Sequence, residues 1–470
     1  MSRVLLVNMP FSSLRWPAIG ISLLKAALTR AGIGSDVAYL NFDLAECLGS
    51  EVYTWIDDAF GFVLGGERLF ARCLWHGVLP SDEDYVREIL RAVDPGFSDS
   101  DRADFERAAA AIPGFLDAAF GAIEWQRYAL VGFTCTFQQT AASLALAARI
   151  KAAHPGITIA FGGASCEGEM GRELLRQFPQ VDLVFSGESD RTFPAAARQV
   201  LERETREFPR GVFTRDQAPF PAIPDATCVE MPDLNALPYP DYDDYFERLA
   251  RSPLHAEIEP VLLFETARGC WWGAQSQCAF CGLNGAAIEF RSKSPDRALA
   301  ELRYLRDRHG VTRVCATDNI LDHRYHRTFL PLLRDADLGM ELEYELKTNL
   351  TRSQVVGLVA AGLKAAQLGV ESLSTPVLKR LRKGVSSIQN LQTLKWLGAT
   401  GIEVKWNFLF GAPGESAADY TDLPALIGQL AHLPPPQAVG PVRIDRFSPY
   451  FEDPAAFGLP RPHALPAYRH

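Results

Sequence analysis

Three cysteines that lie close together in the sequence offer the clearest chemistry in this chain. Cys270, Cys278 and Cys281 belong to the run ARGCWWGAQSQCAFCGLN, with seven residues between the first two and two residues between the last two. The other six of the nine cysteines are dispersed, so each is expected to be a small buried side chain. The three clustered thiols are therefore the candidate metal ligands.

A set of three thiolates favours a metal centre with an open position. Thiolates bind zinc and iron–sulfur clusters. A structural zinc ion normally has four protein ligands, whereas three thiolates on a [4Fe–4S] cluster leave one iron free to bind a substrate. The spacing leaves two alternatives open, a zinc ribbon without its fourth ligand or three buried thiols. No second cysteine pair lies nearby, and no histidine lies between Arg268 and Arg308.

Polar residues and glycines recur where the predicted strands of the C-terminal half end. Asp318 and Asn319 follow one strand, Lys347 and Asn349 end the next, and Glu371 ends a third. Gly411 follows a further strand and lets the backbone approach a ligand. Asp and Asn are also common turn formers and helix caps, so a structural role for each stays an alternative. Their recurrence at consecutive strand ends favours a shared binding site.

The elements that must position these residues form two α/β regions. Strands are predicted at residues 4–8, 36–40, 128–134, 157–161 and 183–186, with a mostly helical insertion near residues 44–124 that includes an amphipathic helix at residues 104–122. Strands alternating with helices predict a parallel, doubly wound sheet over residues 1–215. Glycines then mark strand ends, and ligands of such sheets bind beyond those ends. The candidate residues are Thr134, Gly162, Gly163, Gly187 and Glu188.

A proline-rich stretch, residues 216–255, is predicted to be an extended connector, because proline fixes φ and removes a backbone donor. Residues 256–450 then repeat the alternation, and residues 451–470 form a short tail. Strands are predicted at residues 261–266, 313–317, 342–347, 365–370, 404–410 and 442–447, with helices at residues 296–309, 352–361 and 388–400. Six strand–helix units cannot close an eight-stranded barrel, so a partial (β/α)6 barrel is expected.

Composition excludes several classes of protein. The chain has 470 residues, of which 47% are hydrophobic and 22% charged, as in a globular protein of two or three domains. A net charge of −10 argues against nucleic acid as a partner. No apolar run is long enough to span a bilayer, and the N-terminus does not resemble a signal peptide. We therefore expect a cytoplasmic protein that binds neither membrane nor nucleic acid.

Several motifs together resemble the radical S-adenosylmethionine (SAM) superfamily. The sequence is similar to its cobalamin-binding branch, and specifically to the family of radical SAM C-methyltransferases that mature ribosomally made peptides (RiPPs). The resemblance covers nearly the whole chain, although its cysteine spacing departs from the usual Cys-x3-Cys-x2-Cys. The resembling segments are ETARGCWWGAQSQCAFCGLN from Glu265, Thr317–Asn319, Leu346–Leu350, Gly369–Ser372, Leu381–Gly384, Trp406–Asn407 and Gly411–Glu415.

The resemblance implies a cofactor set and a site for each cofactor. It implies that Cys270, Cys278 and Cys281 hold a [4Fe–4S] cluster whose free iron binds SAM. It also implies that residues at the strand ends of the C-terminal half contact SAM and that the N-terminal domain binds cobalamin. The implied SAM contacts are Asp318, Asn319, Lys347, Asn349, Glu371, Asn407 and Gly411. The chain has no Asp-x-His-x-x-Gly motif, so a histidine ligand to cobalt is not expected.

The implied reaction is C-methylation of an unactivated carbon in a precursor peptide, by way of a 5′-deoxyadenosyl radical and methylcobalamin. An external electron donor such as flavodoxin or ferredoxin is the expected partner besides the peptide. Two alternatives remain: the same cofactors could serve a non-methylating radical reaction such as peptide crosslinking, or the chain could be a non-catalytic metal-binding module of a peptide-modifying complex. Relatives commonly have a longer C-terminal region, which is expected to affect how substrate is covered.

Overall fold

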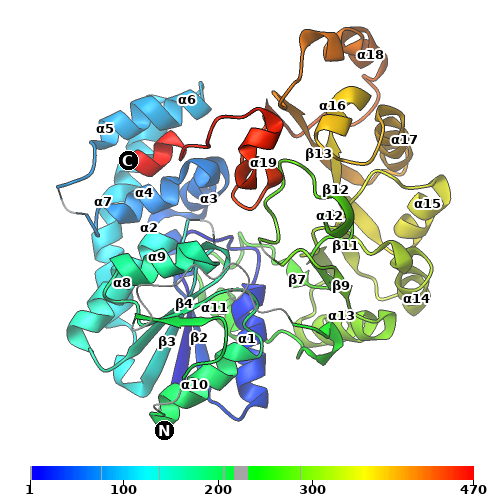
Figure 1. Cartoon of the computed structure of the whole chain (residues 1–470). Helices are drawn as coiled ribbons and strands as arrows, with labels where there is room; N and C mark the ends of the chain where they lie inside the picture. The colour runs from blue at the N-terminus through cyan, green and yellow to red at the C-terminus, as the bar shows by residue number, and fades with distance from the viewer. Residues whose placement is uncertain (1–2, 76, 137, 205–206, 216–230, 286) are drawn as a thin grey trace. The chain divides into compact units, whose positions relative to one another are not determined.

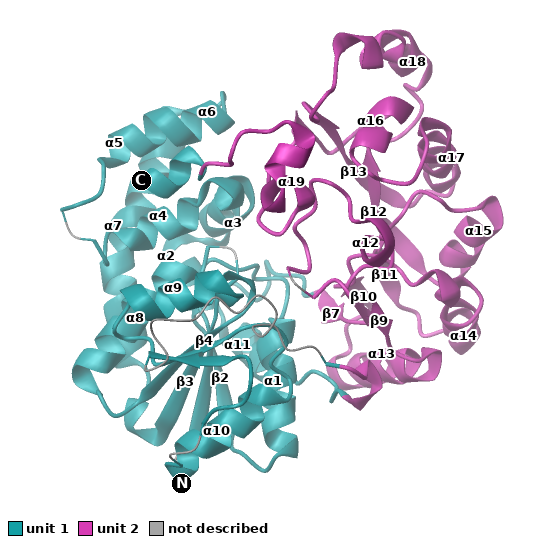
Figure 2. Ribbon diagram, in the orientation of Figure 1, with its two compact units in different colours: residues 1–231, 237–260, 464–470 teal, residues 232–236, 261–463 magenta. Residues whose placement is uncertain are grey.

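A computed structural model of the chain describes residues 3–75, 77–136, 138–204, 207–215, 231–285 and 287–470. The chain divides into two compact units, which Figure 2 shows in different colours. Unit 1 comprises residues 1–231, 237–260 and 464–470, and unit 2 comprises residues 232–236 and 261–463. The prolines at positions 219 and 221 of the predicted connector lie outside the described residues.

Unit 1 is built on a six-stranded sheet with the order β2-β1-β3-β4-β5-β6. The first five strands are parallel, and β6 is antiparallel to β5. The strand order reverses between β1 and β3, which is the point where doubly wound sheets usually bind ligands. The strands are β1 (Arg3–Asn8), β2 (Ser35–Tyr39), β3 (Tyr128–Thr134), β4 (Thr158–Gly162), β5 (Leu183–Phe185) and β6 (Val212–Thr214).

Helices cover both faces of this sheet. Crossovers between parallel strands are right-handed, so helices that run toward opposite edges of the sheet lie on opposite faces. Helix α1 (Ile19–Arg30) leads back to β2 and packs against α10 (Thr192–Glu202), whereas α8 (Thr140–Ala153) and α9 (Glu169–Gln177) lead toward β4 and β5. The predicted doubly wound fold is confirmed.

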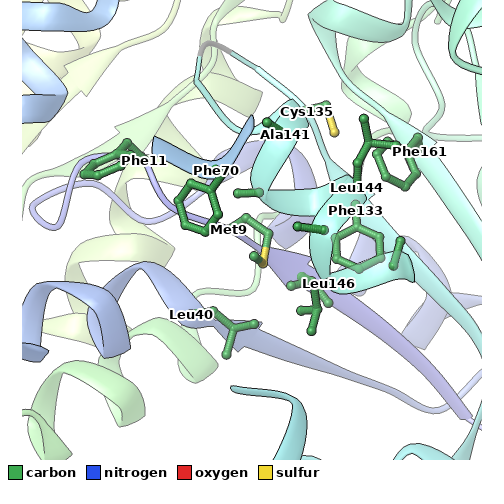
Figure 3. Packing of buried hydrophobic residues seen from close by; sticks show 14 of the residues in the cluster. Met9, Phe11, Leu40, Phe70, Phe133, Cys135, Ala141, Leu144, Leu146 and Phe161 are labelled. Atoms are coloured by element: carbon green, nitrogen blue, oxygen red, sulfur yellow. The ribbon is translucent and has the colours of Figure 1, made fainter. Parts of the chain in front are cut away.

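The core of unit 1 lies between the sheet and the helices of the insertion. Figure 3 shows Met9 and Phe11, which follow β1, beside Phe70 of the insertion, and Phe133 of β3 on the far side of Met9 from Phe70. All four side chains are at most 2% exposed. Burying a Phe or Met side chain contributes roughly 1.5–3 kcal/mol. The strand ends of unit 1 are therefore set in a tightly packed layer.

The insertion is helical, as predicted. Its helices are α2 (Leu40–Leu48), α3 (Ser50–Phe60), α4 (Gly65–Ala71), α5 (Asp82–Tyr85), α6 (Arg91–Val93) and α7 (Asp99–Gly121). Helix α7 begins five residues earlier than expected from its apolar pattern, because Ser98 and Asp101 form a capping box. The Ser98 hydroxyl accepts from the Asp101 N–H, and the Asp101 carboxylate accepts from the Ser98 N–H.

The predicted extended connector is wrong for its second half. Residues 243–251 form helix α11 (Asp243–Arg251), which belongs to unit 1. The Tyr245 ring packs edge-on against Tyr39, and its hydroxyl donates to the Leu14 carbonyl over 2.8 Å. Tyr245 and Leu249 are one helical turn apart and both buried, so they form the apolar stripe that docks α11. The nearby prolines concealed this pattern in the sequence.

The residues predicted as a single tail also divide between the units. Residues 451–463 belong to unit 2, and residues 464–470 pack in unit 1. There Arg68 donates to the His470 carbonyl, and the His470 ring lies edge-on to Tyr85, 5.7 Å between centroids. Figure 1 shows this end of the chain among the helices of the insertion.

Unit 2 contains a six-stranded parallel sheet with the order β14-β13-β12-β11-β10-β7. Successive strands along the chain are neighbours in the sheet, which is the arrangement of a partial barrel, so the predicted fold of this half is confirmed. The strands are β7 (Leu262–Phe264), β10 (Arg313–Ala316), β11 (Glu341–Leu346), β12 (Leu363–Glu371), β13 (Glu403–Phe410) and β14 (Ala438–Pro441).

The sixth strand of this sheet does not lie at residues 442–447, where it was predicted. The strand is β14, four residues earlier, where Val439 pairs with Phe408. The Val442 N–H still donates to the Phe410 carbonyl over 2.8 Å, and the chain then leaves the sheet: Arg443 pairs with Asp445 over 2.6 Å, and Phe447 has a left-handed φ of 67°. The alternation of apolar residues there was real, but this segment packs elsewhere in unit 2.

Helices lie along one side of this sheet, and Figure 2 shows α14, α15 and α17 on its outer side. Side chains alternate along each strand, so Leu342, Tyr344 and Leu346 are buried while Glu343 and Glu345 of the same strand point to the opposite face. The helices are α13 (Pro295–His309), α14 (Phe329–Ala336), α15 (Arg352–Ala360), α16 (Thr375–Arg380), α17 (Ser387–Gly398) and α18 (Leu423–Gln429).

Within the described ranges, none of the helices has the length and apolar character needed to cross a membrane.

Candidate functional site

The three clustered cysteines lie on a loop of unit 2, residues 269–290, which we call the thiol loop. Its base is closed by a two-stranded antiparallel ladder between β8 (Ala267–Arg268) and β9 (Arg291–Ser292). Gly269 follows β8 with φ 79°, and a Cβ atom there would lie 2.1 Å from the Glu289 carbonyl oxygen. Only glycine permits this approach. The loop therefore begins beside the carboxyl end of β7.

Local hydrogen bonds fix the backbone around the thiols. The Cys270 N–H donates to the Ile288 carbonyl over 3.3 Å, and the Gly273 N–H donates to the Cys270 Sγ over 3.3 Å. The Cys281 N–H donates to the Cys278 carbonyl over 3.1 Å. A backbone N–H directed at sulfur stabilises the thiolate form that binds metal.

All three thiols are half-buried. Burial raises the pKa of Cys278, and it raises the pKa of Cys281 to about 11. Cys270 adds to both shifts, so the three sulfurs lie within electrostatic reach of one another. In the part of the chain that the structure describes, no three His, Cys, Asp or Glu side chains converge as a single metal ion requires. Three thiols that interact electrostatically without converging on one point fit an iron–sulfur cluster, which is wider than one ion.

Segments far away in the sequence hold the thiol loop in place. The Ala279 N–H donates to the Leu381 carbonyl, and the Ala279 carbonyl accepts from the Tyr450 N–H, each over 3.0 Å. The Gln277 side chain donates to the carbonyls of Cys281 and Phe447, over 2.9 and 3.2 Å. Tyr450 lies in the first turn of α19 (Pro449–Glu452), so the segment after β14 acts as a clamp. Spacing along the sequence gave no signal for this clamp.

A lysine that sequence reasoning missed lies beside the thiols. Lys383 Nζ is 3.0 Å from Glu371 Oε1, and both side chains are almost buried. Burial alone would lower the pKa of Lys383, but the Glu371 carboxylate and the Cys278 thiol outweigh it and raise the pKa above its usual value. Glu371 ends β12, as predicted, and it does not cap the next helix, because the residue at the N-cap position of α16 is Ser374. A buried lysine needs a partner, but the sequence does not reveal which one.

Lys347 also reaches this group of residues. Its Nζ lies 4.1 Å from the centroid of the Trp272 ring, a cation–π contact, and donates to the Lys383 carbonyl. Burial and the neighbouring Lys383 charge lower the pKa of Lys347 to about 8. The Trp272 Nε1 donates to the Arg382 carbonyl over 3.0 Å, which ties the thiol loop to the turn after α16. The structure thus brings together the three cysteines, Lys347 and Glu371 from the predicted set.

Asp318 has a role that differs from the predicted SAM contact. Its carboxylate is 1% exposed and accepts from the N–H groups of Thr266 and Ala267, over 2.7 and 3.0 Å, and from the Thr266 hydroxyl. Burial raises its pKa to about 7. Thr266 also contacts Tyr344, which faces the helices. Asp318 therefore positions the segment that enters the thiol loop.

The other predicted residues of unit 2 are spread along the same edge. Asn319 donates to Asn284 of the thiol loop over 2.6 Å. Asn349 is exposed after the end of β11. Asn407 lies within β13, and Gly411 follows that strand with φ 79° and open space around its α-carbon. Among these four residues, and within the described part of the chain, Asn319 is the one whose side chain forms a hydrogen bond with the thiol loop.

The candidates in unit 1 lie at the carboxyl ends of three neighbouring strands. Thr134 of β3 pairs with Gly162 of β4, and Gly187 and Glu188 follow β5. The Glu188 carboxylate accepts from the Met231 N–H. These residues therefore share one edge of the sheet, as predicted.

Gly163, one of the candidate residues at these strand ends, is required by the fold itself. It has φ 104°, and a Cβ atom there would lie 2.7 Å from the Cys135 carbonyl oxygen. A Cβ atom at Gly162 would make an ordinary 3.6 Å contact with Phe185. Of the two histidines in this region, His154 precedes β4 at the opposite end of the strand, and His76 lies outside the described residues.

Residues 264–426 match the family model described as the Radical SAM superfamily. Unit 2 therefore contains a radical SAM domain. Among curated proteins, the chain is 27% identical over 319 residues to a ribosomal protein uS12 methylthiotransferase, RimO, of Salinispora tropica, covering 62% of this chain and 61% of the relative. It is 22% identical over 255 residues to an uncharacterized methyltransferase of Pyrococcus horikoshii, covering 52% and 51%. The chain thus spans about three fifths or less of these relatives.

Solved structures resemble nearly the whole chain. The methyltransferase TsrM of Kitasatospora setae, solved with cobalamin and a [4Fe–4S] cluster bound, matches 97% of this chain and 75% of its own with a TM-score of 0.62 and 15% identity. The enzyme OxsB, solved with aqua-cobalamin and SAM bound, matches 96% of this chain and 55% of its own with a TM-score of 0.58 and 15% identity. At such low identity the likeness is one of fold.

Gly384 allows Trp272 to reach Lys347, and replacing it tests the geometry of the site. A Cβ atom at Gly384 would lie 2.1 Å from the Trp272 ring. We expect Gly384→Ala to displace Trp272 and to lower the iron content after anaerobic reconstitution at least severalfold. The control is Gly401→Ala, because Gly401 has a similar positive φ of 74° but no atom lies within 4 Å of the position that a Cβ atom would take. Equal iron content in the two variants would contradict this account of Trp272.

Proposed function

We propose that this chain is a cobalamin-dependent radical SAM enzyme that methylates a carbon of a peptide substrate. The observation that carries the proposal is the thiol loop at the carboxyl edge of a partial barrel, with Lys347, Lys383 and Glu371 gathered beside three half-buried thiols. Active sites of βα barrels lie at this edge. The match to the radical SAM superfamily supports the proposal.

Cys270, Cys278 and Cys281 would hold the [4Fe–4S] cluster, which supplies the electron that cleaves SAM. The three thiolates bring negative charge into a partly buried site. Burial raises the pKa of the Cys278 thiol, and the nearby ammonium groups of Lys383 and Lys347 oppose this rise, so they favour the thiolate that binds iron. The clamp on the thiol loop keeps the sulfurs in a fixed arrangement.

Glu371 is the residue that we assign to SAM. It ends β12 on the same edge as the thiol loop, and Lys383 holds its carboxylate over 3.0 Å. The carboxylate has acceptor capacity left for hydroxyl groups of a ribose. Because Glu371 forms an ion pair with Lys383, such hydrogen bonds would be charge-assisted.

Cobalamin would bind at the strand ends of unit 1, where it supplies a carrier for the methyl group. Thr134, Gly162, Gly187 and Glu188 lie along one edge, next to the point where the strand order reverses. The fold shared with TsrM and OxsB, whose structures contain cobalamin, supports this assignment. Within the described residues of this edge, no histidine lies beside these candidates, which favours a cobalt without a histidine ligand.

A precursor peptide as substrate and flavodoxin or ferredoxin as electron donor are parts of the proposal that rest on the resemblance of the sequence. Two other radical reactions compete with methylation. The similarity to RimO favours transfer of a methylthio group, and the same cofactors also suit crosslinking. The mass of a modified peptide separates the three, because it would gain a methyl group, gain a methylthio group, or lose hydrogen. A non-catalytic metal-binding module would form no 5′-deoxyadenosine.

The cluster assignment predicts the effect of removing each thiol. Alanine cannot bind iron, so Cys270→Ala, Cys278→Ala and Cys281→Ala should each lose the visible absorbance of the cluster and form no 5′-deoxyadenosine from SAM and reductant. Cys47→Ala is the control, because Cys47 is exposed on the insertion of unit 1. Full iron content and activity in one of the three variants would exclude that cysteine as a ligand.

Removing Glu371 should weaken SAM binding. Charge-assisted hydrogen bonds contribute about 1.5–3 kcal/mol, so Glu371→Ala should lower the SAM affinity of the protein that retains its cluster roughly tenfold to hundredfold, while cobalamin content stays unchanged. Equilibrium binding of SAM and thermal unfolding are measured on the same variant. Unchanged affinity with a lower melting temperature would show that Glu371 only partners Lys383.

Cobalamin binding is tested on the full-length chain, mixed with hydroxocobalamin and desalted. We expect the protein to retain corrin absorbance, and its failure to do so would refute the assignment. Gly162→Val should retain less, because its Cβ atom fits the fold while its methyl groups extend beyond the end of β4. Thermal unfolding of this variant checks that unit 1 stays folded. Gly163→Leu is unsuitable because it would disrupt the backbone at Cys135.

A further inference from the structure

One face of the unit 2 sheet carries polar side chains, and we call it the lumen face. The register of neighbouring strands places Cys315 of β10 beside Glu343 of β11, and Glu345 of β11 beside Gln367 of β12. Gln367 in turn lies beside Lys405 of β13. Residues paired in this way point to the same side of a parallel sheet. This side is opposite to the buried Leu342, Tyr344 and Leu346.

An ion pair confirms that these side chains share a face. Lys405 Nζ lies 2.8 Å from Glu343 Oε1, although β12 runs between their strands. The contact crosses over Ala365, which is small and pairs with Glu343 in the register. The interior of a closed βα barrel is filled mainly by bulky branched apolar residues. Half-exposed charged residues on the lumen face instead indicate that this surface receives a polar ligand.

Glu345 differs from the other carboxylates near it. Glu343 is paired with Lys405, and Glu371 is paired with Lys383. Within the described residues, the side chain of Glu345 forms no hydrogen bond or ion pair, and the residue is only partly exposed. It lies two residues before Lys347, which places their backbones about 7 Å apart along the strand. Glu345 is therefore an unpaired carboxylate just below the thiol loop.

The surroundings of Glu345 affect its charge. Partial burial, then the negative charge of Glu371, raises its pKa to about 7, and Lys383 opposes the shift. The charged and titratable groups that face it are Glu343, Cys315, Glu371, Lys383 and Lys405. The lumen face thus gains one uncompensated negative charge as pH rises through about 7.

We propose that Glu345 is a specificity-determining residue that binds a cationic nitrogen group of the substrate, an amine or a guanidinium. The inference rests on the proposed function, since that function makes the lumen face the place where the substrate lies. A cationic donor would form a charge-assisted hydrogen bond with the Glu345 carboxylate. Glu343 and Glu371 are already paired with lysines, so Glu345 is the carboxylate near them that is left to accept from a ligand. In a peptide substrate, a Lys or Arg side chain or a free amino terminus carries such a group.

The test uses small probes on the full-length protein with its cluster reconstituted. Binding of n-pentylamine and of n-pentanol is measured by ligand-observed NMR for the unsubstituted protein, Glu345→Gln and Glu341→Gln. Glu341 is the matched control because it lies on the same face of the same strand, at the opposite end. We expect Glu345→Gln to weaken pentylamine binding about tenfold at pH 8, with Glu341→Gln unchanged and pentanol unaffected.

The pH dependence gives a second readout. An alkylamine stays protonated well above pH 8, so a change in its affinity between pH 6 and pH 8 reports the carboxylate. Affinity should rise severalfold over this range in the unsubstituted protein, because Glu345 becomes ionised. Glu345→Gln should remove the rise, and Glu341→Gln should keep it.

Equal binding of pentylamine by Glu345→Gln and Glu341→Gln, or equal binding of pentylamine and pentanol by the unsubstituted protein, would overturn the inference. Iron content and 5′-deoxyadenosine yield are measured on the same preparations. Absence of 5′-deoxyadenosine would refute the proposed function, while the amine binding would still decide the role of Glu345. Formation of 5′-deoxyadenosine with no effect of Glu345→Gln would refute the inference alone.

Discussion

The buried contact between Lys383 and Glu371 is the interaction on which the rest of the candidate site depends. Each side chain is a charge in a nearly closed environment, and removing one partner of such a pair costs about 3–5 kcal/mol because the other charge remains buried. Lys383 also provides the carbonyl that Lys347 binds, and Arg382 before it binds Trp272. The turn after α16 therefore connects β11, β12 and the thiol loop.

The parallel sheet explains why these residues meet. The carboxyl ends of parallel strands lie along one edge, so Lys347, just after β11, and Glu371, at the end of β12, come close although they are far apart in the sequence. The two faces of the same strands then take different roles. Leu342 and Tyr344 pack under the helices, while Glu343 and Glu345 stay on the open side. The alternation of apolar and polar side chains along one strand thus produces both a face that packs in the core and a polar face for a ligand.

Glycines set how closely the loops approach each other. Gly269 lets the base of the thiol loop close against Glu289, and Gly384 leaves room for Trp272. In unit 1, Gly163 does the same for the turn at Cys135. These positions carry no chemistry themselves, but they fix the backbone that presents the chemical groups. Some glycines that resemble part of a cofactor-binding motif in the sequence are therefore required by the packing of the backbone.

The sequence by itself determined the local properties of this protein. Alternation of apolar residues identified β1, β3 and β11 closely, and the spacing of Cys270, Cys278 and Cys281 identified the thiol loop, since both are properties of neighbouring residues. Only the tertiary structure decided the rest, because it depends on contacts between distant segments. Residues 442–447 lie in the clamp instead of the sheet, and helix α11 packs in unit 1. Asp318 is buried against Thr266. Lys383 is paired with Glu371, whereas Glu345 has no such partner among the described residues. The type of a residue determines which groups its side chain can bind, but the fold determines which of those groups lie close enough to bind it.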